Sequence, residues 1–258
     1  MLGSIENGQI VKNTEKAVIL DKPNFVFVED EMSDKIIYTI YGHKGCGKTT
    51  TAFLFKGKKY CISFDKKSSV IKNNYFDGRD DIKVYDGTKY LVETAEEYVQ
   101  SSIVCYDYVN FLLDNIEAQK DCDYIIIDGL EILQKLAEMN MRGQYHLTPF
   151  QGVSNPNVWK LRTLLIRNIH NKALNCCKKG VIYTTYIDKD EVVEEGTIIT
   201  KTDIPKWVDI VFYTTDVVLR VNNTSGKDGR KCTVDVVSSK TKDFKTGDKI
   251  DITNKKEW

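Results

Sequence analysis

The stretch "YGHKGCGKTT", residues 41–50, places three glycines, two lysines and two threonines directly after the apolar run "KIIYTI", residues 35–40. Each glycine inside ordinary secondary structure costs roughly 0.5–1 kcal/mol, so three of them in one bend suggest a specific purpose. A backbone with so few side chains can curl until successive N–H groups point inward, and such a concavity binds anions. We therefore expect an anion-binding loop between a strand and a helix.

The spacing identifies the type of loop. Gly42 is followed, after four residues, by Gly47-Lys48-Thr49, which completes the pattern G-x-x-x-x-G-K-[ST] of phosphate loops. Backbone amides at a helix N-terminus would face the phosphates, the Lys48 ammonium would reach the β- and γ-phosphates, and the Thr49 hydroxyl would ligate Mg²⁺. The nucleotide-binding residues expected from this motif are Gly42, His43, Lys44, Gly45, Cys46, Gly47, Lys48, Thr49 and Thr50.

Cys46 lies inside this loop, next to the expected helix N-terminus. An electropositive site of this kind favours the thiolate and makes a cysteine reactive. We therefore expect Cys46 to react with alkylating reagents faster than the other cysteines, and bound nucleotide to shield it.

The overall composition restricts the class of protein. The 258 residues carry 37 basic and 37 acidic side chains, so only a local patch could hold a nucleic acid. No apolar run of about 18 residues and no hydrophobic signal core is visible, which predicts a cytoplasmic protein without a membrane partner. The seven cysteines are scattered without C-x-x-C spacing, which argues against a disulfide framework or a zinc site.

Apolar runs alternate with helical patterns along most of the chain, which is typical of α/β proteins with a parallel sheet. We expect an N-terminal extension or β-hairpin over residues 1–35 and one ATPase domain over residues 36–258. The strands expected in the first half of that domain are 36–41, 60–65 and 82–86, and the capping-box spacing of residues 94–97 opens a helix.

The segment "DYIIIDGLEIL", residues 123–133, carries the second site residue. Four consecutive apolar or aromatic residues describe a strand buried on both faces, and Asp128 stands at its C-terminal tip, where parallel α/β sheets bind ligands. We expect Asp128 to hold Mg²⁺ together with Thr49. Glu131, three residues further on, either stands beside Asp128 as a catalytic carboxylate or faces solvent.

The second half of the chain changes its pattern. Residues 158–177 predict an amphipathic helix and residues 180–185 the next buried strand, which would bring Thr184 or Thr185 near the γ-phosphate. From residue 190 onward the pattern is β, with a hairpin around Glu195-Gly196. The fold class predicted is therefore α/β, a P-loop core with a mainly parallel central sheet and a β-rich C-terminal part.

This order of parts resembles the RecA-like branch of P-loop ATPases, and within it the Sak-type recombination and annealing ATPases of phages and archaeal viruses. The segments that carry the resemblance are "IYGHKGCGKTTTAF", "CISFD", "YIIIDGLEIL", "VWKLR", "VIYTT", "DVVLRV" and "SSKTKDFKTGDKIDIT". The resemblance implies a RecA-like fold, binding of ATP and Mg²⁺, ATP hydrolysis, and a homo-oligomer with nucleotide at its subunit interfaces. It also implies that Lys240 and Lys242 reach the nucleotide of a neighbouring subunit.

The sequence departs from the family at one position. The family places a catalytic glutamate two residues beyond the aspartate of its second strand, whereas "FDKKSS" has Lys67 there. Either another carboxylate, Asp65 or Glu131, orients the attacking water, or turnover is slow.

Single-stranded DNA is a further expected partner. By position, it would contact the loops that follow the strands of Asp128 and Thr185. The first, residues 140–157, offers Arg142, Tyr145, His146 and Phe150, and interleaved basic and aromatic residues can stack bases. The second, residues 187–196, carries five acidic residues against one lysine, which would repel phosphates, whereas residues 222–256 carry nine Lys/Arg against five Asp.

Other classes remain open. "DITNKKEW", residues 251–258, approximates the Asn-Lys-x-Asp motif of GTPases, but Glu257 replaces the aspartate. A small-molecule kinase would need an arginine-rich lid, and the few arginines are scattered. A packaging-motor or helicase subunit shares the same core, and a non-hydrolysing nucleotide-dependent binding module would suit Lys67.

Overall fold

The computed structural model describes residues 5–6, 9–10, 34–194, 196–206, 214–226 and 229–258. The chain forms two compact units, residues 1–33 and residues 34–258. In the first unit, β1 (Ile5–Glu6) pairs with β2 (Gln9–Ile10) in an antiparallel ladder. Most of the N-terminal extension or β-hairpin expected over residues 1–35, including residues 11–33, lies outside the described residues.

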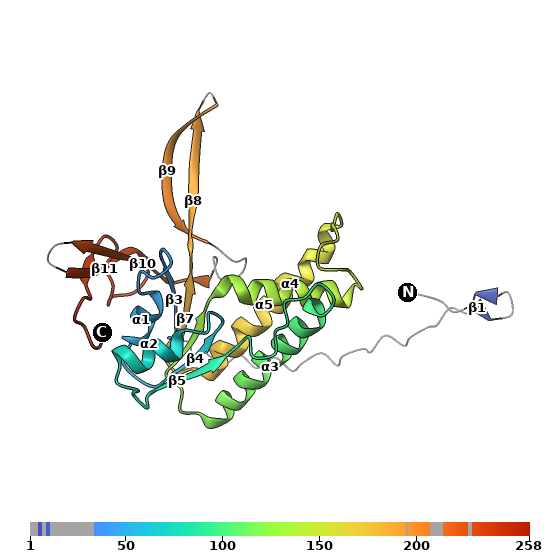
Figure 1. Cartoon of the computed structure of the whole chain (residues 1–258), viewed down its shortest axis with the longest axis horizontal. Coiled ribbons are helices and arrows are strands. Elements are labelled where there is room, and N and C mark those ends of the chain that lie inside the picture. The colour runs from blue at the N-terminus through green and yellow to red at the C-terminus, as the bar shows by residue number, and fades with distance from the viewer. Residues whose placement is uncertain (1–4, 7–8, 11–33, 195, 207–213, 227–228) are drawn as a thin grey trace, which may run out of the picture. The chain divides into compact units, whose positions relative to one another are not determined.

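In the second unit, the described residues contain one sheet of eight strands (Figure 1). In spatial order these are β12 (Lys249–Asp251), β11 (Gly229–Ser239), β10 (Val217–Gly226), β3 (Ile36–Tyr41), β7 (Gly180–Thr185), β6 (Tyr124–Asp128), β4 (Lys59–Ser63) and β5 (Ile82–Asp86). The six from β10 to β5 run parallel, and β11 is antiparallel to both of its neighbours. The predicted α/β class, with its mainly parallel sheet and β-rich C-terminal part, is confirmed.

Helices cover both faces of this sheet, which explains why its central strands are continuously apolar. On β6, Ile125 and Ile127 pack into one core cluster while Ile126 packs into the other, because successive side chains point to opposite faces. One cluster is completed by α3 (Tyr98–Gln119), α4 (Leu130–Gln144) and α5 (Pro156–Cys176). The other is completed by α1 (Lys48–Phe53), residues flanking α2 (Ser68–Tyr75) and the C-terminal segment.

The strand order positions the site. The phosphate-loop strand β3 and the Asp128 strand β6 are not neighbours, because β7 lies between them and pairs in parallel with both. In this register, Tyr41 pairs with Thr185 and Asp128 pairs with Thr184. The C-terminal ends of all three strands therefore meet at one edge of the sheet, where the loops that follow them converge.

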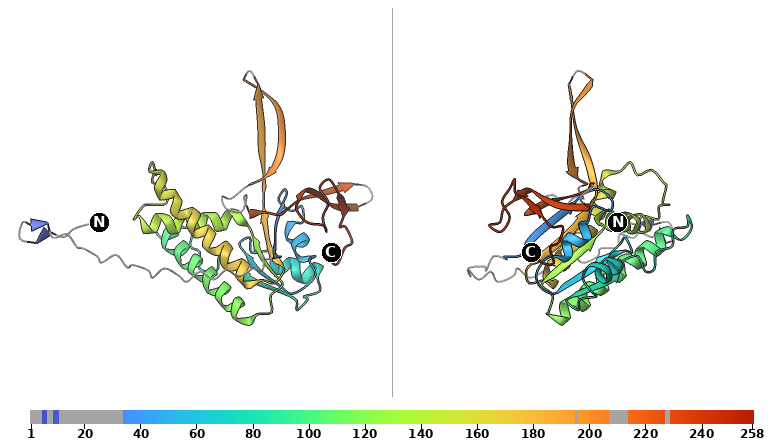
Figure 2. Two further views of the ribbon diagram at one scale, coloured as in Figure 1. Left: turned by 180° about the vertical axis from the view of Figure 1, so that it is seen from behind. Right: turned by 60° about the vertical axis from the view of Figure 1, so that its left-hand side comes forward.

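A long β-hairpin leaves the sheet at this same edge. Its strands β8 (Ile187–Glu194) and β9 (Thr197–Pro205) pair in an antiparallel ladder, as the sequence predicted, and project away from the sheet (Figures 1 and 2). At its base, Asp203 forms an ion pair with Arg220, and its carbonyl oxygen accepts a hydrogen bond of 3.3 Å from the Tyr41 hydroxyl. The hairpin is thus fixed to β3 and β10.

Two boundaries differ clearly from the predicted ones. Helix α3 begins at Tyr98, four residues after the Thr94 of the expected capping box. Helix α4 continues to Gln144, so the loop predicted over residues 140–157 is limited to residues 145–155. Within the described part of the chain, no helix combines the length and the apolar character that crossing a membrane would require.

Candidate nucleotide-binding site

The phosphate loop fills the turn between β3 and α1, and its glycines are required by its geometry. Gly45 and Gly47 have φ values of 77° and 108°, in the left-handed region that glycine adopts without strain. A Cβ added at Gly42 would lie 2.6 Å from the carbonyl oxygen of Val221. Helix α1 begins directly after this loop, at Lys48, so the unpaired N–H groups of its first turn open toward the loop.

Lys48 spans the inside of the loop. Its ammonium group donates hydrogen bonds of 3.0 Å and 3.1 Å to the carbonyl oxygens of Gly42 and His43, and lies 4.2 Å from the centre of the Tyr186 ring. Burial lowers the pKa of Lys48 below its ordinary value, while nearby acidic groups, Glu131 and Asp128 among them, oppose that shift. Lys48 therefore stands where the sequence motif requires it.

Asp128 is buried at the end of β6, with only 2% of its surface exposed. Three hydroxyl groups donate to its carboxylate: Thr49 at 3.0 Å to each oxygen, Ser68 at 2.6 Å and Thr184 at 2.6 Å. Burial raises the pKa of Asp128 above its ordinary value, and the hydrogen bonds from these hydroxyls partly offset that rise. The carboxylate is thus fixed in position by α1, α2 and β7 together.

Ser68 is a site residue that sequence reasoning missed. It is the first residue of α2, is fully buried, and bonds both to Asp128 and, at 2.6 Å, to the Ser63 hydroxyl at the end of β4. The only signal in the sequence was a serine shortly after the second core strand. Serine is common at helix starts, and nothing local links it to a carboxylate sixty residues away.

Glu131 stands beside the site and does not face bulk solvent. It lies in the first turn of α4, and its Oε1 accepts hydrogen bonds from the Thr185 hydroxyl (2.7 Å) and the Tyr186 amide. Its other oxygen, Oε2, is buried and has no hydrogen-bond partner among the described residues. The hydrogen bonds to Oε1 thus hold the Glu131 side chain in place beside the pocket.

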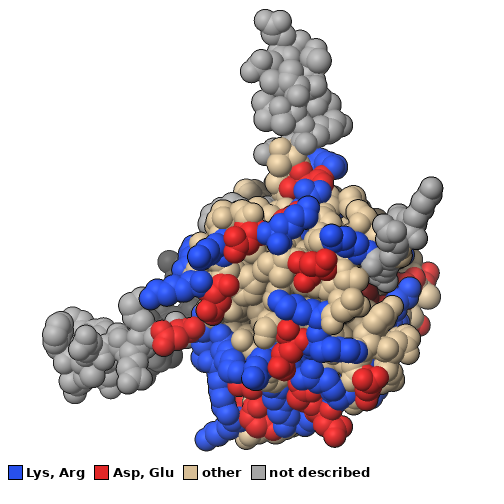
Figure 3. Space-filling model, turned by 90° about the vertical axis from the view of Figure 1, so that its left-hand side faces the viewer, with Lys and Arg blue, Asp and Glu red and all other residues tan. Residues whose placement is uncertain are grey.

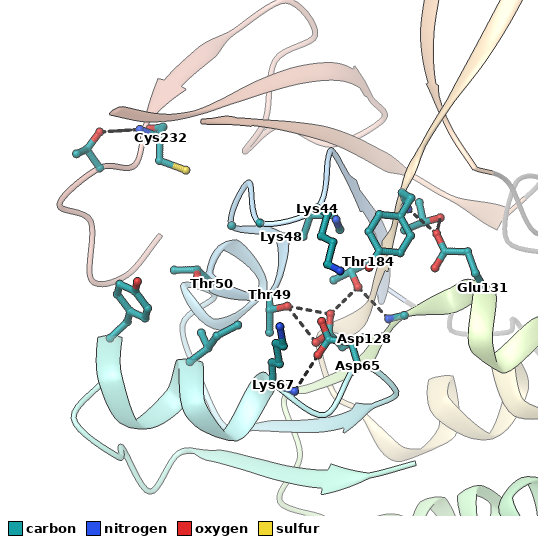
Figure 4. Close-up of a pocket in the computed structure, with 18 of the residues that line it drawn as sticks. Lys44, Lys48, Thr49, Thr50, Asp65, Lys67, Asp128, Glu131, Thr184 and Cys232 are labelled. Atoms are coloured by element: carbon teal, nitrogen blue, oxygen red, sulfur yellow. Dashed lines mark hydrogen bonds between the residues drawn. The ribbon is translucent and has the colours of Figure 1, made fainter. Parts of the chain in front are cut away.

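These residues line one pocket of about 660 Å³, a size typical of small-molecule sites (Figure 4). The pocket also contains Asp65 and Lys67, which belong to the turn between β4 and α2. Beyond them, Ile71 and Tyr75 follow along α2. The remaining lining residues are Lys44, Gly45, Gly47, Thr50, Gly129, Thr184, Thr185, Tyr186, Cys232, Thr253 and Asn254.

The donor set suits a magnesium ion. The Thr49 hydroxyl and the Asp128 carboxylate are hard oxygen ligands, and they already lie 3.0 Å apart. Mg²⁺ is usually bound by one or two such groups together with substrate phosphates and water. Thr49 and Asp128 would therefore hold the ion at the edge of the pocket that adjoins the phosphate loop.

Lys240 and Lys242 do not line the pocket of their own chain. The Lys240 ammonium donates a hydrogen bond of 3.1 Å to the carbonyl oxygen of Thr215, and its backbone amide donates to Asp216, next to the start of β10. Because β11 runs antiparallel to β10, Lys240 lies near the beginning of β3, at the end of the strand away from the phosphate loop. Within one chain, these lysines are separate from the site.

The expectation for Cys46 needs correction. Its side chain is only 5% exposed and packs in the core cluster that contains α1, and its sulfur would lie 2.5 Å from a Cβ on Gly42. The thiol therefore turns into the protein, away from the phosphate-binding side. Cys232 instead lines the pocket and, unlike the other six cysteines, is partly exposed.

We predict that iodoacetamide modifies Cys232 faster than the other cysteines, and that Mg²⁺-ATP slows this reaction, because a nucleotide in the pocket covers the sulfur. Peptide mass mapping after timed labelling, with and without nucleotide, measures both rates. Labelling of Cys46 before Cys232, or equal labelling of Cys232 in the presence of ATP, would contradict the observed geometry.

Comparisons with known proteins give the family of the chain. No curated protein matches the chain. Among solved structures, a KaiC-like protein from the hyperthermophilic archaeon Pyrococcus horikoshii OT3 is similar, with 13% sequence identity, coverage of 84% of each chain and a TM-score of 0.47. A family model described as an AAA domain matches residues 34–248, which include the phosphate loop, Asp128 and Glu131. The chain therefore belongs to this AAA-domain family of P-loop ATPases.

Proposed function

We propose that this protein binds Mg²⁺-ATP in the pocket above the sheet edge and hydrolyses its terminal phosphoanhydride bond. The observation that carries the proposal is the direct contact between Thr49 of the phosphate loop and the buried Asp128, 3.0 Å from each carboxylate oxygen. This contact brings the phosphate loop and the proposed metal-binding carboxylate together in one site. When bound, Mg²⁺ would neutralise charge on the β- and γ-phosphates.

The pocket has a phosphate end and a base end. Lys48 and the amides at the start of α1 would hold the phosphates beside Asp128. Tyr75, which is 51% exposed on α2, and Asn254 of the C-terminal segment also line the pocket, and we propose that they form its other end. A purine base stacked on Tyr75 and hydrogen-bonded to the Asn254 amide would fit this arrangement.

Loss of the Lys48 ammonium tests the site as a whole. In the Lys48→Ala variant we expect the affinity for Mg²⁺-ATP to fall more than about tenfold, because a charge-assisted hydrogen bond to phosphate is lost. Calorimetric titration measures the affinity, and circular dichroism checks the fold. Lys56→Ala, in an exposed residue outside the pocket, is the matched control and should bind like the parent. Undiminished affinity in a folded Lys48→Ala variant would refute the proposal.

The Sak-type ATPases that the sequence resembles use a glutamate to orient the attacking water. In this chain, Glu131 is the carboxylate that can best take over that role. Its Oε1 is held by Thr185 and Tyr186, so the unpaired Oε2 can accept a proton or hydrogen bond from an attacking water. Asp65 also lines the pocket, but it is exposed, and one of its oxygens accepts a hydrogen bond from the Lys67 amide. We therefore propose that Glu131 orients the attacking water.

The Glu131→Gln variant should bind Mg²⁺-ATP with nearly the parent affinity but release phosphate at least about 100-fold more slowly, since an amide cannot accept the proton. Single-turnover phosphate release and calorimetry separate the two quantities. Glu117→Gln, in an exposed residue of α3, serves as the control. If Glu131→Gln turned over at the parent rate and Asp65→Asn did not, the role would pass to Asp65.

We further propose that the ATPase is of the recombination type, assembles into oligomers and acts on single-stranded DNA. The aromatic residues of the loop 145–155 support this proposal, since Phe150 is 85% exposed and Tyr145 is 47% exposed. Arg142, expected to contact DNA, is instead buried, and its guanidinium holds the loop through the carbonyl oxygens of Thr148 and Gln151. Lysine and arginine side chains also gather between acidic ones on the face shown in Figure 3.

Phosphate release per subunit, measured across a dilution series with and without a single-stranded oligonucleotide, tests this proposal. We expect the rate per subunit to fall on dilution, since Lys240 and Lys242 can complete only a neighbour's site, and to rise several-fold with DNA. The Phe150→Ala variant should lose the stimulation but keep the basal rate. A flat dilution series would favour a monomeric ATPase. A rate insensitive to DNA would favour a packaging motor, and no phosphate release a nucleotide-dependent binding module.

A further inference from the structure

Lys67 occupies the position at which the resembling family has a carboxylate, and it lies directly against the proposed phosphate end of the pocket. It is the residue that precedes α2, and it lines the pocket together with Thr49 and Asp128. Figure 4 shows its side chain rising from the start of α2 toward Thr49 and Asp128. The ammonium group therefore points to the place where the terminal phosphate and its metal ion would sit.

The backbone around Lys67 fixes this direction. The preceding Lys66 has a φ of 61°, and the amide of Lys67 donates a hydrogen bond of 3.0 Å to Asp65 Oδ1. The next residue, Ser68, is buried and bonded to Asp128. The start of the Lys67 side chain is thus positioned by the buried Ser68 on one side and by the hydrogen bond to Asp65 on the other.

Helix α2 lies along the length of the pocket. Lys67, Ile71 and Tyr75 are spaced by four residues, and all three line the pocket, so they share one face of the helix. At a rise of 1.5 Å per residue, Lys67 and Tyr75 are separated by about 12 Å along the axis. This separation places Lys67 at the phosphate end when Tyr75 stands at the base end.

The surroundings of the Lys67 ammonium group would allow it to bind an anionic ligand. The described residues place no carboxylate within ion-pair distance of its ammonium group. The pocket is lined by three lysines, Lys44, Lys48 and Lys67, and by three carboxylates, Asp65, Asp128 and Glu131. A bound metal ion would neutralise the negative charge of Asp128. The Lys67 ammonium group would then bind a phosphate oxygen.

We propose that Lys67 is a specificity-determining residue that binds the γ-phosphate within the same chain and so selects the triphosphate over the diphosphate. The inference rests on the proposed function, because it assumes that a nucleotide occupies this pocket. In place of the carboxylate that would activate water, the chain presents a cation that holds the terminal phosphate. Release of that phosphate then removes the partner of Lys67 and weakens binding of the product.

The test compares Lys67→Met, which keeps the alkyl stem and removes the charge, with Lys67→Arg, which retains the charge. Lys66→Met is the matched control, because Lys66 is the exposed neighbour outside the pocket. Affinities for Mg²⁺-ADP and for the Mg²⁺ complex of the β,γ-imido analogue of ATP are measured by calorimetry. Circular dichroism verifies that each variant folds.

We expect Lys67→Met to weaken binding of the triphosphate analogue about tenfold, as for a partly exposed charge-assisted hydrogen bond, and to change ADP affinity less than twofold. Lys67→Arg and Lys66→Met should keep the parent's preference for the triphosphate. Equal losses for both nucleotides, or no loss for either, would overturn the inference while leaving the proposed function intact. A parent protein that binds neither nucleotide would overturn both.

The dependence of binding on Mg²⁺ distinguishes this proposal from a second role that Lys67 could have. If the ammonium group served as a substitute for Mg²⁺ beside Asp128, the parent would bind the triphosphate analogue equally well with and without Mg²⁺, and Lys67→Met would make binding depend on it. That result would also overturn the inference. Mg²⁺-dependent binding in the parent, with the preference for triphosphate lost only in Lys67→Met, supports it.

Discussion

The buried carboxylate of Asp128 is the constraint on which the geometry of this site depends. A carboxylate withdrawn from water is costly unless hydrogen bonds or a metal ion compensate it. Three hydroxyls supply the hydrogen bonds, and they come from Thr49, Ser68 and Thr184, which belong to three separate elements. Satisfying this one group therefore fixes the start of α1, the start of α2 and the end of β7 relative to β6.

The order of strands makes this arrangement possible. Because β7 lies between β3 and β6, the phosphate loop must bridge the end of β7 to reach Asp128. Thr184 lies under that bridge, and its hydroxyl both donates to Asp128 and accepts from the amide of Gly129 at 3.0 Å. The threonines at the end of β7 are thus part of the site, although threonine is also an ordinary residue for a strand.

The sequence was most informative where the chemistry is local. The spacing from Gly42 to Thr49 and the aspartate at a strand tip predicted the phosphate loop and the pocket residue Asp128, because both signals lie within one short segment. The direction of a side chain within a loop is not local information. Cys46 packs into the core, where its sulfur takes the space that a side chain at Gly42 would need.

Gly143 illustrates a second limit of sequence reasoning. The sequence predicted a loop over residues 140–157, yet α4 continues through Gly143 to Gln144. Gly143 faces another helix, and a Cβ on it would come within 2.6 Å of the Ile103 side chain on α3. Here glycine permits the close approach of two helices and does not interrupt one of them. Only the tertiary packing distinguishes these two uses.

The same dependence on tertiary contacts joins the site to the β8–β9 hairpin. The Thr185 hydroxyl lies 2.7 Å from Glu131 Oε1 and 2.8 Å from the carbonyl oxygen of Lys206, which follows the hairpin. A hydroxyl has one proton to donate, so these two acceptors share it. Tyr186, which directly precedes the hairpin, donates its backbone N–H to the same oxygen of Glu131. The Glu131 carboxylate is therefore linked, through Thr185 and Tyr186, to the residues that flank both strands of the hairpin at its base.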